Sequence, residues 1–374
     1  MSATWLLARR NLLRNRARLV VSIGGVALAL TLVLALDAIF EGVSRQMTSY
    51  IDRSGAEIWV GQAGVRNLHM VASWMPDSVT DDVLAIEGVA AAEPILYTTD
   101  AISAGDERGW AYVIGLTSTA SMGGPWDVVE GAGQPGPGEA VIDRRFAQRA
   151  GVGLGDQVTM LGRDFRIAGL TEGTASLVNS VAFVTFDDFA ARRGGDPVVS
   201  FVLVGTADGV SPDAVALAIG SRVRGVSVQT TEAFAASEKR LGLDMSGDVI
   251  SIMNIIGFVV GLAVVALTVY VATLALRREY GSLKAFGAPT GYLYSVVLTQ
   301  AALSVVIGFV AGIAVTAALS AIVPRAGVNL ELAISGESLV KVGIVAAVIA
   351  ALAALLPIRQ IAGLDPAVVA REGV

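Results

Sequence analysis

The chain has 374 residues and no cysteine; 54% of its residues are hydrophobic and only 16% are charged. The lack of cysteine excludes disulfides, thiol catalysis and cysteine metal sites. The apolar residues are concentrated in uncharged runs such as residues 249–276. Because such a run exceeds the roughly 20 residues that a helix needs to cross a bilayer, an ordinary soluble protein is excluded as well.

The formal net charge of -6 averages over two opposed regions. Residues 42–247 hold about 15 basic and about 25 acidic side chains, whereas the charged residues within 9–18 are all basic. Since basic flanks stay on the inner side of a membrane, we expect both chain termini in the cytoplasm and the acidic middle outside. No basic groove-like patch lies away from the membrane flanks, so nucleic acid is not an expected partner.

The first 55 residues predict a membrane anchor that continues into a stalk. Residues 1–18 are expected to form a cytoplasmic amphipathic segment on the membrane surface, because arginines and leucines alternate there at helical spacing. Residues 19–55 follow as the first transmembrane helix and its stalk. The apolar positions of the stalk recur at intervals of three and four: Ile39, Val43, Met47 and Tyr50. A signal peptide is the alternative, but the apolar run is long for one and lacks a clear cleavage site.

Residues 56–229 predict an extracytoplasmic α/β domain built from short elements. Strand-like runs occur at 56–60, 110–116 and 200–204, and a short helix is expected after Ser78. Residues 138–158 predict a strand, a short helix, a glycine-rich turn and a second strand. The glycine-rich stretches 123–126 and 131–138 predict a loop between subdomains.

The last part of the chain predicts three more transmembrane helices. We expect a stalk and the second transmembrane helix at 230–276, with threonine as the N-cap. A cytoplasmic coupling helix is expected at 277–292, the third transmembrane helix at 293–323, a short outer loop at 324–338, the fourth transmembrane helix at 339–358, and a cytoplasmic tail at 359–374. The fourth helix is expected to end at Pro357.

The motifs of enzymes are missing from this sequence. No Gly-x-x-x-x-Gly-Lys-Ser/Thr run is present to hold nucleotide phosphates, and no Gly-x-Ser-x-Gly nucleophile turn occurs. The single histidine, His69, has no partner motif for a catalytic metal and is interpreted as a surface or packing residue. We therefore expect no catalytic residue, cofactor or metal in this chain.

Charged and small residues near membrane depth have a structural interpretation. Asp37 and Lys341 fall at the predicted outer ends of helices, where their side chains can reach water, so interfacial positions are favoured over proton coupling. Small residues in the third and fourth spans predict close helix packing: Gly308, Ala311, Gly312, Ala346 and Ala347.

Three stretches together resemble one family. The run Arg277-Arg-Glu-Tyr-Gly-Ser-Leu-Lys-Ala-Phe-Gly-Ala-Pro289 is similar to the cytoplasmic coupling-helix region of FtsX-like, or MacB-type, ABC transporter permeases. Residues 7–18 resemble the family's approach to its first helix, and residues 357–367 resemble its proline-to-proline segment after the fourth. The resemblance covers the whole chain, because one span, a large outer domain and three closing spans are the family's topology. Residues 138–158 are also similar to its periplasmic core domain.

The resemblance implies a type VII, mechanotransmission permease of the bacterial cytoplasmic membrane, with four transmembrane helices and a MacB-like periplasmic core domain between helices 1 and 2. It implies a dimer with a second permease copy and two copies of a separate ABC ATPase subunit, which would carry ATP and Mg²⁺. A periplasmic adaptor or membrane fusion protein is a further partner that it allows. Five residues of the coupling helix are assigned on physical grounds to ATPase binding: Arg278 and Lys284 as polar anchors, Leu283 and Phe286 as apolar anchors, and Glu279.

Three functions stay open at this point. The first is export or extraction of a lipidic, peptide or drug-like substrate by mechanical movement of the outer domain. The second is an FtsX-like regulator that activates a cell-wall hydrolase, and the third is a membrane-anchored binding receptor without an ATPase. The first, driven by a separate ATPase subunit, is the preferred hypothesis, and the other two are its alternatives.

Overall fold

The structure is a computed structural model, and it describes residues 16–68, 71–175, 179–192, 194, 196–323 and 332–362. His69, most of the predicted N-terminal segment, most of the loop at 324–338 and most of the C-terminal tail lie outside the described residues. The chain divides into two compact units. One, the helical unit, comprises residues 1–42, 247–326 and 331–374, and the other, the α/β unit, is formed chiefly by residues 43–246.

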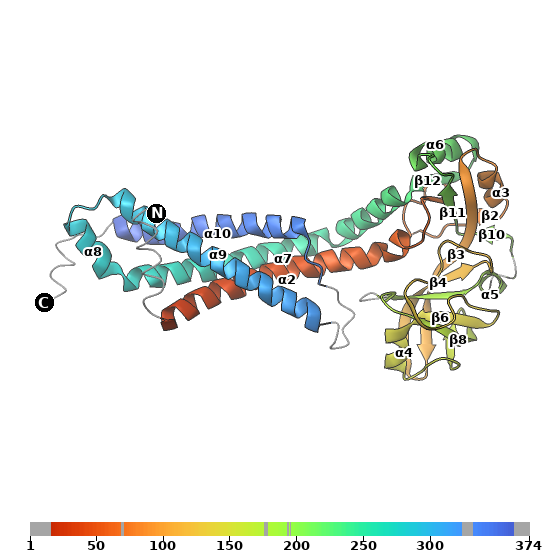
Figure 1. Ribbon diagram of the computed structural model, residues 1–374, viewed down its shortest axis with the longest axis horizontal. Coiled ribbons are helices and arrows are strands. Elements are labelled where there is room, and N and C mark those ends of the chain that lie inside the picture. The colour runs from red at the N-terminus through yellow and green to blue at the C-terminus, as the bar shows by residue number, and fades with distance from the viewer. Residues whose placement is uncertain are drawn as a thin grey trace. The chain divides into compact units, whose positions relative to one another are not determined.

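The helical unit is built from several long helices and one short helix, which Figure 1 draws in red, green and blue. They are α2 (Arg16–Asp52), α7 (Thr231–Ala275), the short α8 (Arg277–Ala285), α9 (Thr290–Ile322) and α10 (Gly336–Ala362). Four of these contain stretches that are long and apolar enough to cross a membrane: Ile23–Asp52, Ile255–Ala275, Thr290–Ile322 and Gly336–Arg359. The prediction of four membrane helices is confirmed among the described residues, and the protein is a membrane protein.

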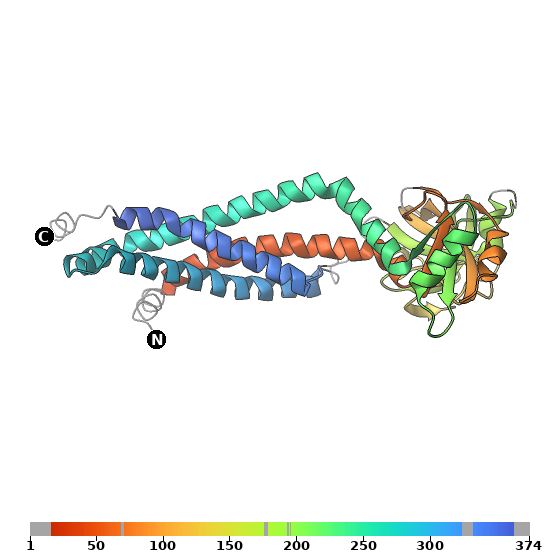
Figure 2. The same ribbon diagram turned by 90° about the horizontal axis from the view of Figure 1, so that it is seen from above.

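The transmembrane helices pack around a shared apolar core. Val26 and Leu30 of α2, Val265 of α7 and Ile349 of α10 are fully buried in it. Helix α10 runs beside α9, as both views show (Figures 1 and 2). Many other large apolar side chains of these helices point outward, which is the arrangement expected of helices that meet lipid instead of water.

Two predicted boundaries differ from the structure. Helix α10 does not end at Pro357 but continues to Ala362, with the proline inside it. A proline in a membrane helix costs one backbone hydrogen bond, and neighbouring helices and local adjustment make this tolerable, so its sequence signal for a helix end is weaker there. Within the predicted coupling segment 277–292, α8 covers only Arg277–Ala285; a turn follows, and α9 already begins at Thr290, three residues before the predicted start of the third membrane helix.

The α/β unit is organised on one mixed sheet of ten strands (Figure 1). Its strands are β1 (Ile58–Gln62), β3 (Val89–Ala104), β4 (Glu107–Leu116), β5 (Val128–Gly131), β6 (Glu139–Asp143), β7 (Gln157–Met160), β8 (Arg163–Thr171), β9 (Asn179–Thr185), β11 (Phe201–Thr206) and β12 (Val226–Thr230). The spatial order is β12-β1-β11-β3-β4-β9-β6-β8-β5, with β7 paired to β3 and β8. The strands β2 (Met75–Pro76) and β10 (Val198–Val199) form a separate small pair.

Parallel pairing occurs in the middle of the sheet, where β9 lies beside β4 and β6 beside β8. Strand β9 is buried at five successive positions, Ser180–Val184, which is why its sequence has no polar alternation. The covering helices are short: α3 (Val79–Leu84), α4 (Arg144–Ala150), α5 (Phe186–Ala191) and α6 (Pro212–Arg222). The predicted strand-helix-turn-strand pattern at 138–158 is confirmed as β6, α4, a glycine-containing turn and β7.

Both long helices α2 and α7 enter the core of the α/β unit. Tyr50, near the end of α2, is 2% exposed and lies 5.9 Å from Trp59 and 6.4 Å from Phe183 between ring centroids. From α7, Phe234 stacks on Trp59 with centroids 5.0 Å apart. The backbone nitrogen of Thr231 donates to Glu57 O at 2.9 Å. Tyr50 of α2 and Phe234 of α7 therefore pack in the same aromatic cluster of the α/β unit.

Candidate functional site

The predicted coupling segment is a distinct two-turn helix, α8. At Leu276, whose φ is -101° and ψ is 7°, the backbone leaves the helical conformation of α7. Glu279 in the first turn of α8 and Lys284 in the last are placed favourably for the helix dipole. Ser282 Oγ donates to the carbonyl of Arg278 at 3.0 Å.

Helix α8 ends in a closed turn that leads directly into α9. The backbone nitrogen of Ala288 donates to Leu283 O at 3.0 Å, and that of Gly287 to Lys284 O at 3.1 Å. This hydrogen-bond pair is the Schellman motif, and it requires a left-handed residue, which Gly287 supplies with φ +86°. Pro289 is the N-cap of α9. The connection between α8 and α9 is therefore short and has a fixed backbone conformation.

One side of α8 is fixed to the membrane helices. Tyr280 is 1% exposed and belongs to the apolar core of the helical unit together with Leu276. Leu283 is half-buried and packs against the same core. Sequence reasoning did not single out Tyr280, although its spacing from Leu276 and Leu283, i, i+4 and i+7, is the signal of one helix face.

The other side of α8 faces outward. Phe286 is 90% exposed, Arg278 is exposed, and Glu279 and Lys284 are half-buried. Of the five residues assigned from the sequence, Leu283 therefore contributes mainly to internal packing, whereas Phe286 presents nearly its whole ring. An exposed aromatic ring rimmed by charged side chains is typical of a protein-binding surface.

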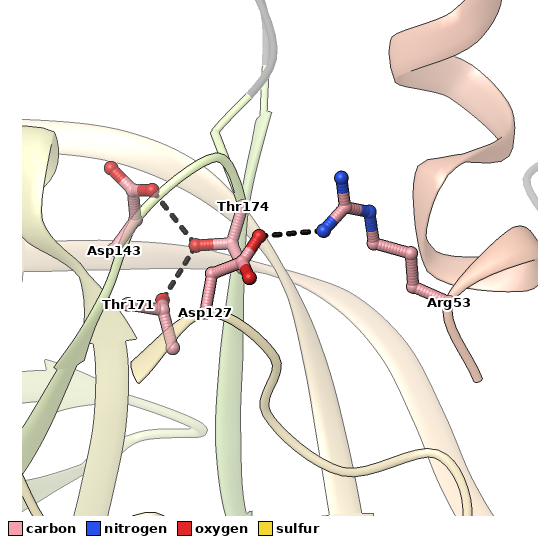
Figure 3. Close-up of polar contacts among 5 residues, drawn as sticks. All are labelled: Arg53, Asp127, Asp143, Thr171 and Thr174. Atoms are coloured by element: carbon pink, nitrogen blue, oxygen red, sulfur yellow. Dashed lines mark hydrogen bonds and ion pairs between the residues drawn. The ribbon is translucent and has the colours of Figure 1, made fainter. Parts of the chain in front are cut away.

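The α/β unit holds polar contacts near the C-terminal end of α2, and Figure 3 draws the one between Arg53 and Asp127. Arg53 Nη1 lies 2.5 Å from Asp127 Oδ2 in an exposed ion pair. Tyr50 Oη donates to Gly123 O at 3.1 Å, and Gly123 N donates to Ser54 O at 2.6 Å. The segment between β4 and β5 thus contacts Tyr50 in the last turn of α2 and the two residues Arg53 and Ser54 just after this helix.

Tyrosine side chains and a buried aspartate of the α/β unit contribute to the packing and hydrogen bonding of the fold. Burial raises the pKa of Tyr97 well above the ordinary value, and burial raises that of Tyr112 to about 12. Asp143 is fully buried, accepts from Arg145 N at 2.8 Å and receives the hydroxyl of Thr174 at 2.8 Å (Figure 3). Within the described residues no group of three or more His, Cys, Asp or Glu side chains is placed to hold a metal ion.

Comparison with known protein families assigns both parts of the chain. The family of the MacB-like periplasmic core domain matches residues 19–222, and the FtsX-like permease C-terminal family matches residues 251–366. The chain belongs to the MacB/FtsX-type ABC transporter permeases. Curated relatives have the same extent. ABC transporter permeases of Mycobacterium bovis and Mycobacterium tuberculosis, both described as uncharacterized, are 22% identical over 363 residues, covering 96% of this chain and 97% of each relative.

Solved structures similar to this permease are outer domains. The periplasmic region of MacB from Actinobacillus actinomycetemcomitans is 12% identical, with a TM-score of 0.38, over 49% of this chain and 92% of that one. The extracellular domain of the noncanonic ABC-type transporter YknZ from Gram-positive bacteria is 13% identical, with a TM-score of 0.37, over 47% of this chain and all of that one.

Proposed function

We propose that this permease couples ATP hydrolysis on a separate ATPase subunit to mechanical movement of its α/β unit, and that α8 is the element that binds the ATPase. The observation that carries the proposal is the pairing of a buried Tyr280 in α8 with a 90% exposed Phe286 at the C-cap of the same helix. Because Tyr280 fixes α8 in the apolar core of the membrane helices, a force applied to the exposed side of α8 is passed on to those helices.

In this proposal, the α/β unit is the part of the permease that is moved. Because Tyr50 of α2 and Phe234 of α7 both lie in its aromatic core, displacement of either helix displaces the sheet. No path for a substrate through the bilayer is required. ATP and Mg²⁺ are held by the partner, since this sequence contains no phosphate-binding loop.

The functional assembly is two permease copies with two ATPase subunits in the bacterial cytoplasmic membrane. The chain termini and α8 are cytoplasmic, and the α/β unit lies outside, as the basic residues at Arg277, Arg278 and Lys284 favour. The cargo is a lipidic, peptide or drug-like substrate taken from the outer leaflet or the periplasm, with an adaptor protein as an additional partner.

Co-purification and ATPase activity test the proposal. The chain is co-expressed with the candidate ATPase and compared with the Glu279→Ala/Phe286→Ala double variant. Loss of the large exposed ring should weaken complex formation and remove the stimulation of hydrolysis, because aromatic residues dominate interface energies. Leu217→Ala is the matched control, since Leu217 is also strongly exposed, at 77%, but lies on α6.

The outcomes separate the candidate functions. Unchanged association and hydrolysis in the double variant would show that α8 is only a membrane turn and would favour the receptor. A complex that hydrolyses ATP but moves no cargo, in a strain with defects in cell separation, would favour regulation of a cell-wall hydrolase.

A further inference from the structure

Helix α9 lies unusually close to α2. A Cβ atom placed on Gly308 would lie 2.5 Å from Val26 Cγ1 and 3.1 Å from the backbone nitrogen of Ala27. One turn further along α9, a Cβ on Gly312 would lie 3.3 Å from the backbone nitrogen of Thr31. Glycine at both positions therefore lets the backbones of the two helices touch where any side chain would separate them.

The contacts between α2 and α7 in the helical unit are of a different kind. A Cβ on Gly25 would lie 3.3 Å from the side chain of Val264, and one on Gly257 would lie 3.6 Å from that of Val33. Only side-chain atoms are met at these two positions, and side chains can change rotamer and let helices shift. The contact of α9 with α2 involves both kinds of atom: the nearest atom at Gly308 is Val26 Cγ1, but backbone nitrogens lie at 3.1 Å from a Cβ there and at 3.3 Å from one on Gly312, and backbone cannot change rotamer.

The α9 contact lies between the input and the output of the proposed mechanism. Helix α9 follows α8 through the closed turn at Gly287 and Pro289. Helix α2 continues without a break from Val26 to Asp52, and its Tyr50 belongs to the core of the α/β unit. By contrast, the connection of α8 to α7 passes through Leu276, where the helix is interrupted.

We infer that Gly308 and Gly312 are positioning residues that make α9 and α2 one rigid body, so that movement of α8 is delivered to the α/β unit through α2. This inference rests on the proposed function, because it presumes that α8 receives the movement. It assigns different roles to the two stalks: α2 is driven directly, and α7 follows through side-chain contacts.

The test uses the full chain in complex with the ATPase, and it exploits the absence of native cysteine. Nitroxide labels are placed on Ser282→Cys in α8 and on Leu28→Cys in α2, both exposed positions. A second pair joins Ser282→Cys to Leu267→Cys in α7, which is 64% exposed. Distances are measured by pulsed electron paramagnetic resonance in the nucleotide-free complex and after trapping with ADP and vanadate.

In the labelled chain that keeps Gly308 and Gly312, the distance between labels at 282 and 28 should stay constant on trapping. The distance between labels at 282 and 267 should shift. Gly308→Ala should make the first distance shift or broaden, with loss of cargo movement. Adding Val26→Ala removes the side-chain atom at 2.5 Å from the new methyl group and should restore the constant distance in part, because the backbone nitrogen of Ala27 stays at 3.1 Å. Gly291→Ala is the control on the same helix, since a Cβ there meets nothing within 4 Å.

Opposite results would overturn the inference. A shift of the 282–28 distance in the unsubstituted packing shows that α9 and α2 move separately, and this holds even if Gly308→Ala does not fold. A Gly308→Ala complex that behaves like Gly291→Ala contradicts it too. Failure of the ATPase to bind the unsubstituted chain overturns the proposed function together with the inference, whereas normal binding with a shifting 282–28 distance overturns the inference alone.

Discussion

Residues of the same chemical type have different roles in this permease, depending on whether they are buried or exposed. On α8, Tyr280 is buried and Phe286 is exposed, although both are aromatic and only six positions apart. Within the α/β unit, Asp143 and Glu57 are both carboxylates, yet the first is fully buried and the second is exposed. Their different surroundings lead to two predictions about stability.

Asp143→Ala should destabilise the α/β unit. The carboxylate caps α4 by accepting from the backbone nitrogen of Arg145 and also receives Thr174 Oγ1. Losing a cap and leaving buried donors unsatisfied costs about 2 to 4 kcal/mol. For a domain of this size, the corresponding fall in melting temperature is roughly 4 to 16 °C. Calorimetry of the detergent-solubilised chain measures it, with the exposed Asp208→Ala as control; equal melting of the two variants would contradict the prediction.

Glu57 should give the α/β unit a pH-dependent stability. Its carboxylate accepts from Thr206 Oγ1 at 2.5 Å and from Thr206 N at 2.6 Å, and these bonds, the hydroxyl's first, lower the pKa of Glu57. A lowered pKa stabilises the fold above the unfolded value of about 4.3, and the stabilisation is lost as the pH falls through the folded value. Thr206→Val should therefore weaken the drop in melting temperature between about pH 6 and pH 3. Thr98→Val, which alters a hydroxyl far from Glu57 in the sequence, should leave that drop unchanged.

At the scale of elements, an ion pair joins two membrane helices. Lys341 Nζ of α10 donates to Asp37 Oδ1 of α2, and the backbone nitrogen of Ala333 donates to Ala38 O at 3.0 Å. Asp37 is only 6% exposed. The expectation that the Asp37 side chain reaches water is wrong, since its carboxylate is buried and pairs with a lysine from a helix about 300 positions away.

Removing one member of this pair should be worse than removing both. Lys341→Leu leaves the buried Asp37 carboxylate without its cation, whereas Asp37→Leu/Lys341→Leu replaces the pair by apolar side chains. We expect the single variant to lose up to about 3 kcal/mol, reduced because Lys341 is half-exposed, and the double variant to lose less. Thermal unfolding in detergent compares the two. A double variant that is less stable than the single one would contradict this account.

At the scale of the whole molecule, two units are joined by two continuous helices. Helices α2 and α7 each belong partly to the helical unit and partly to the α/β unit. The described backbone of α2 is helical over 37 residues and that of α7 over 45. Continuous helices are suited to carrying mechanical displacement.

The orientation of the molecule can be measured because the chain has no native cysteine. Ser282→Cys in α8 should react with a membrane-impermeant thiol reagent only in inverted vesicles. Leu217→Cys in α6 should react only in spheroplasts with an intact membrane. Both positions are exposed in the structure, so the contrast reports sidedness and not burial. Labelling of both from the same side would refute the predicted topology.

The sequence by itself determined the class of this protein and the order of its parts. Uncharged runs longer than a bilayer predict membrane helices because unpaired backbone groups are too costly in lipid. The motif from Arg277 to Pro289 and the inserted α/β region led to the MacB/FtsX family, which the family comparison confirmed. Local patterns were also sufficient to place β6, α4 and β7, although distant residues such as Thr174 and Ile167 complete their hydrogen bonds.

The tertiary structure decided which residues meet across long sequence distances. Tyr280 anchors α8 because it packs in the core of the membrane helices. Leu283 packs against the same core, although the sequence suggested that it would contact the ATPase. Asp37 meets Lys341, and Gly308 meets Val26, because helices far apart in the chain pack side by side. Hydropathy and periodicity indicate which face of a helix is apolar, but every apolar face suits lipid and protein alike, so only packing selects the neighbour.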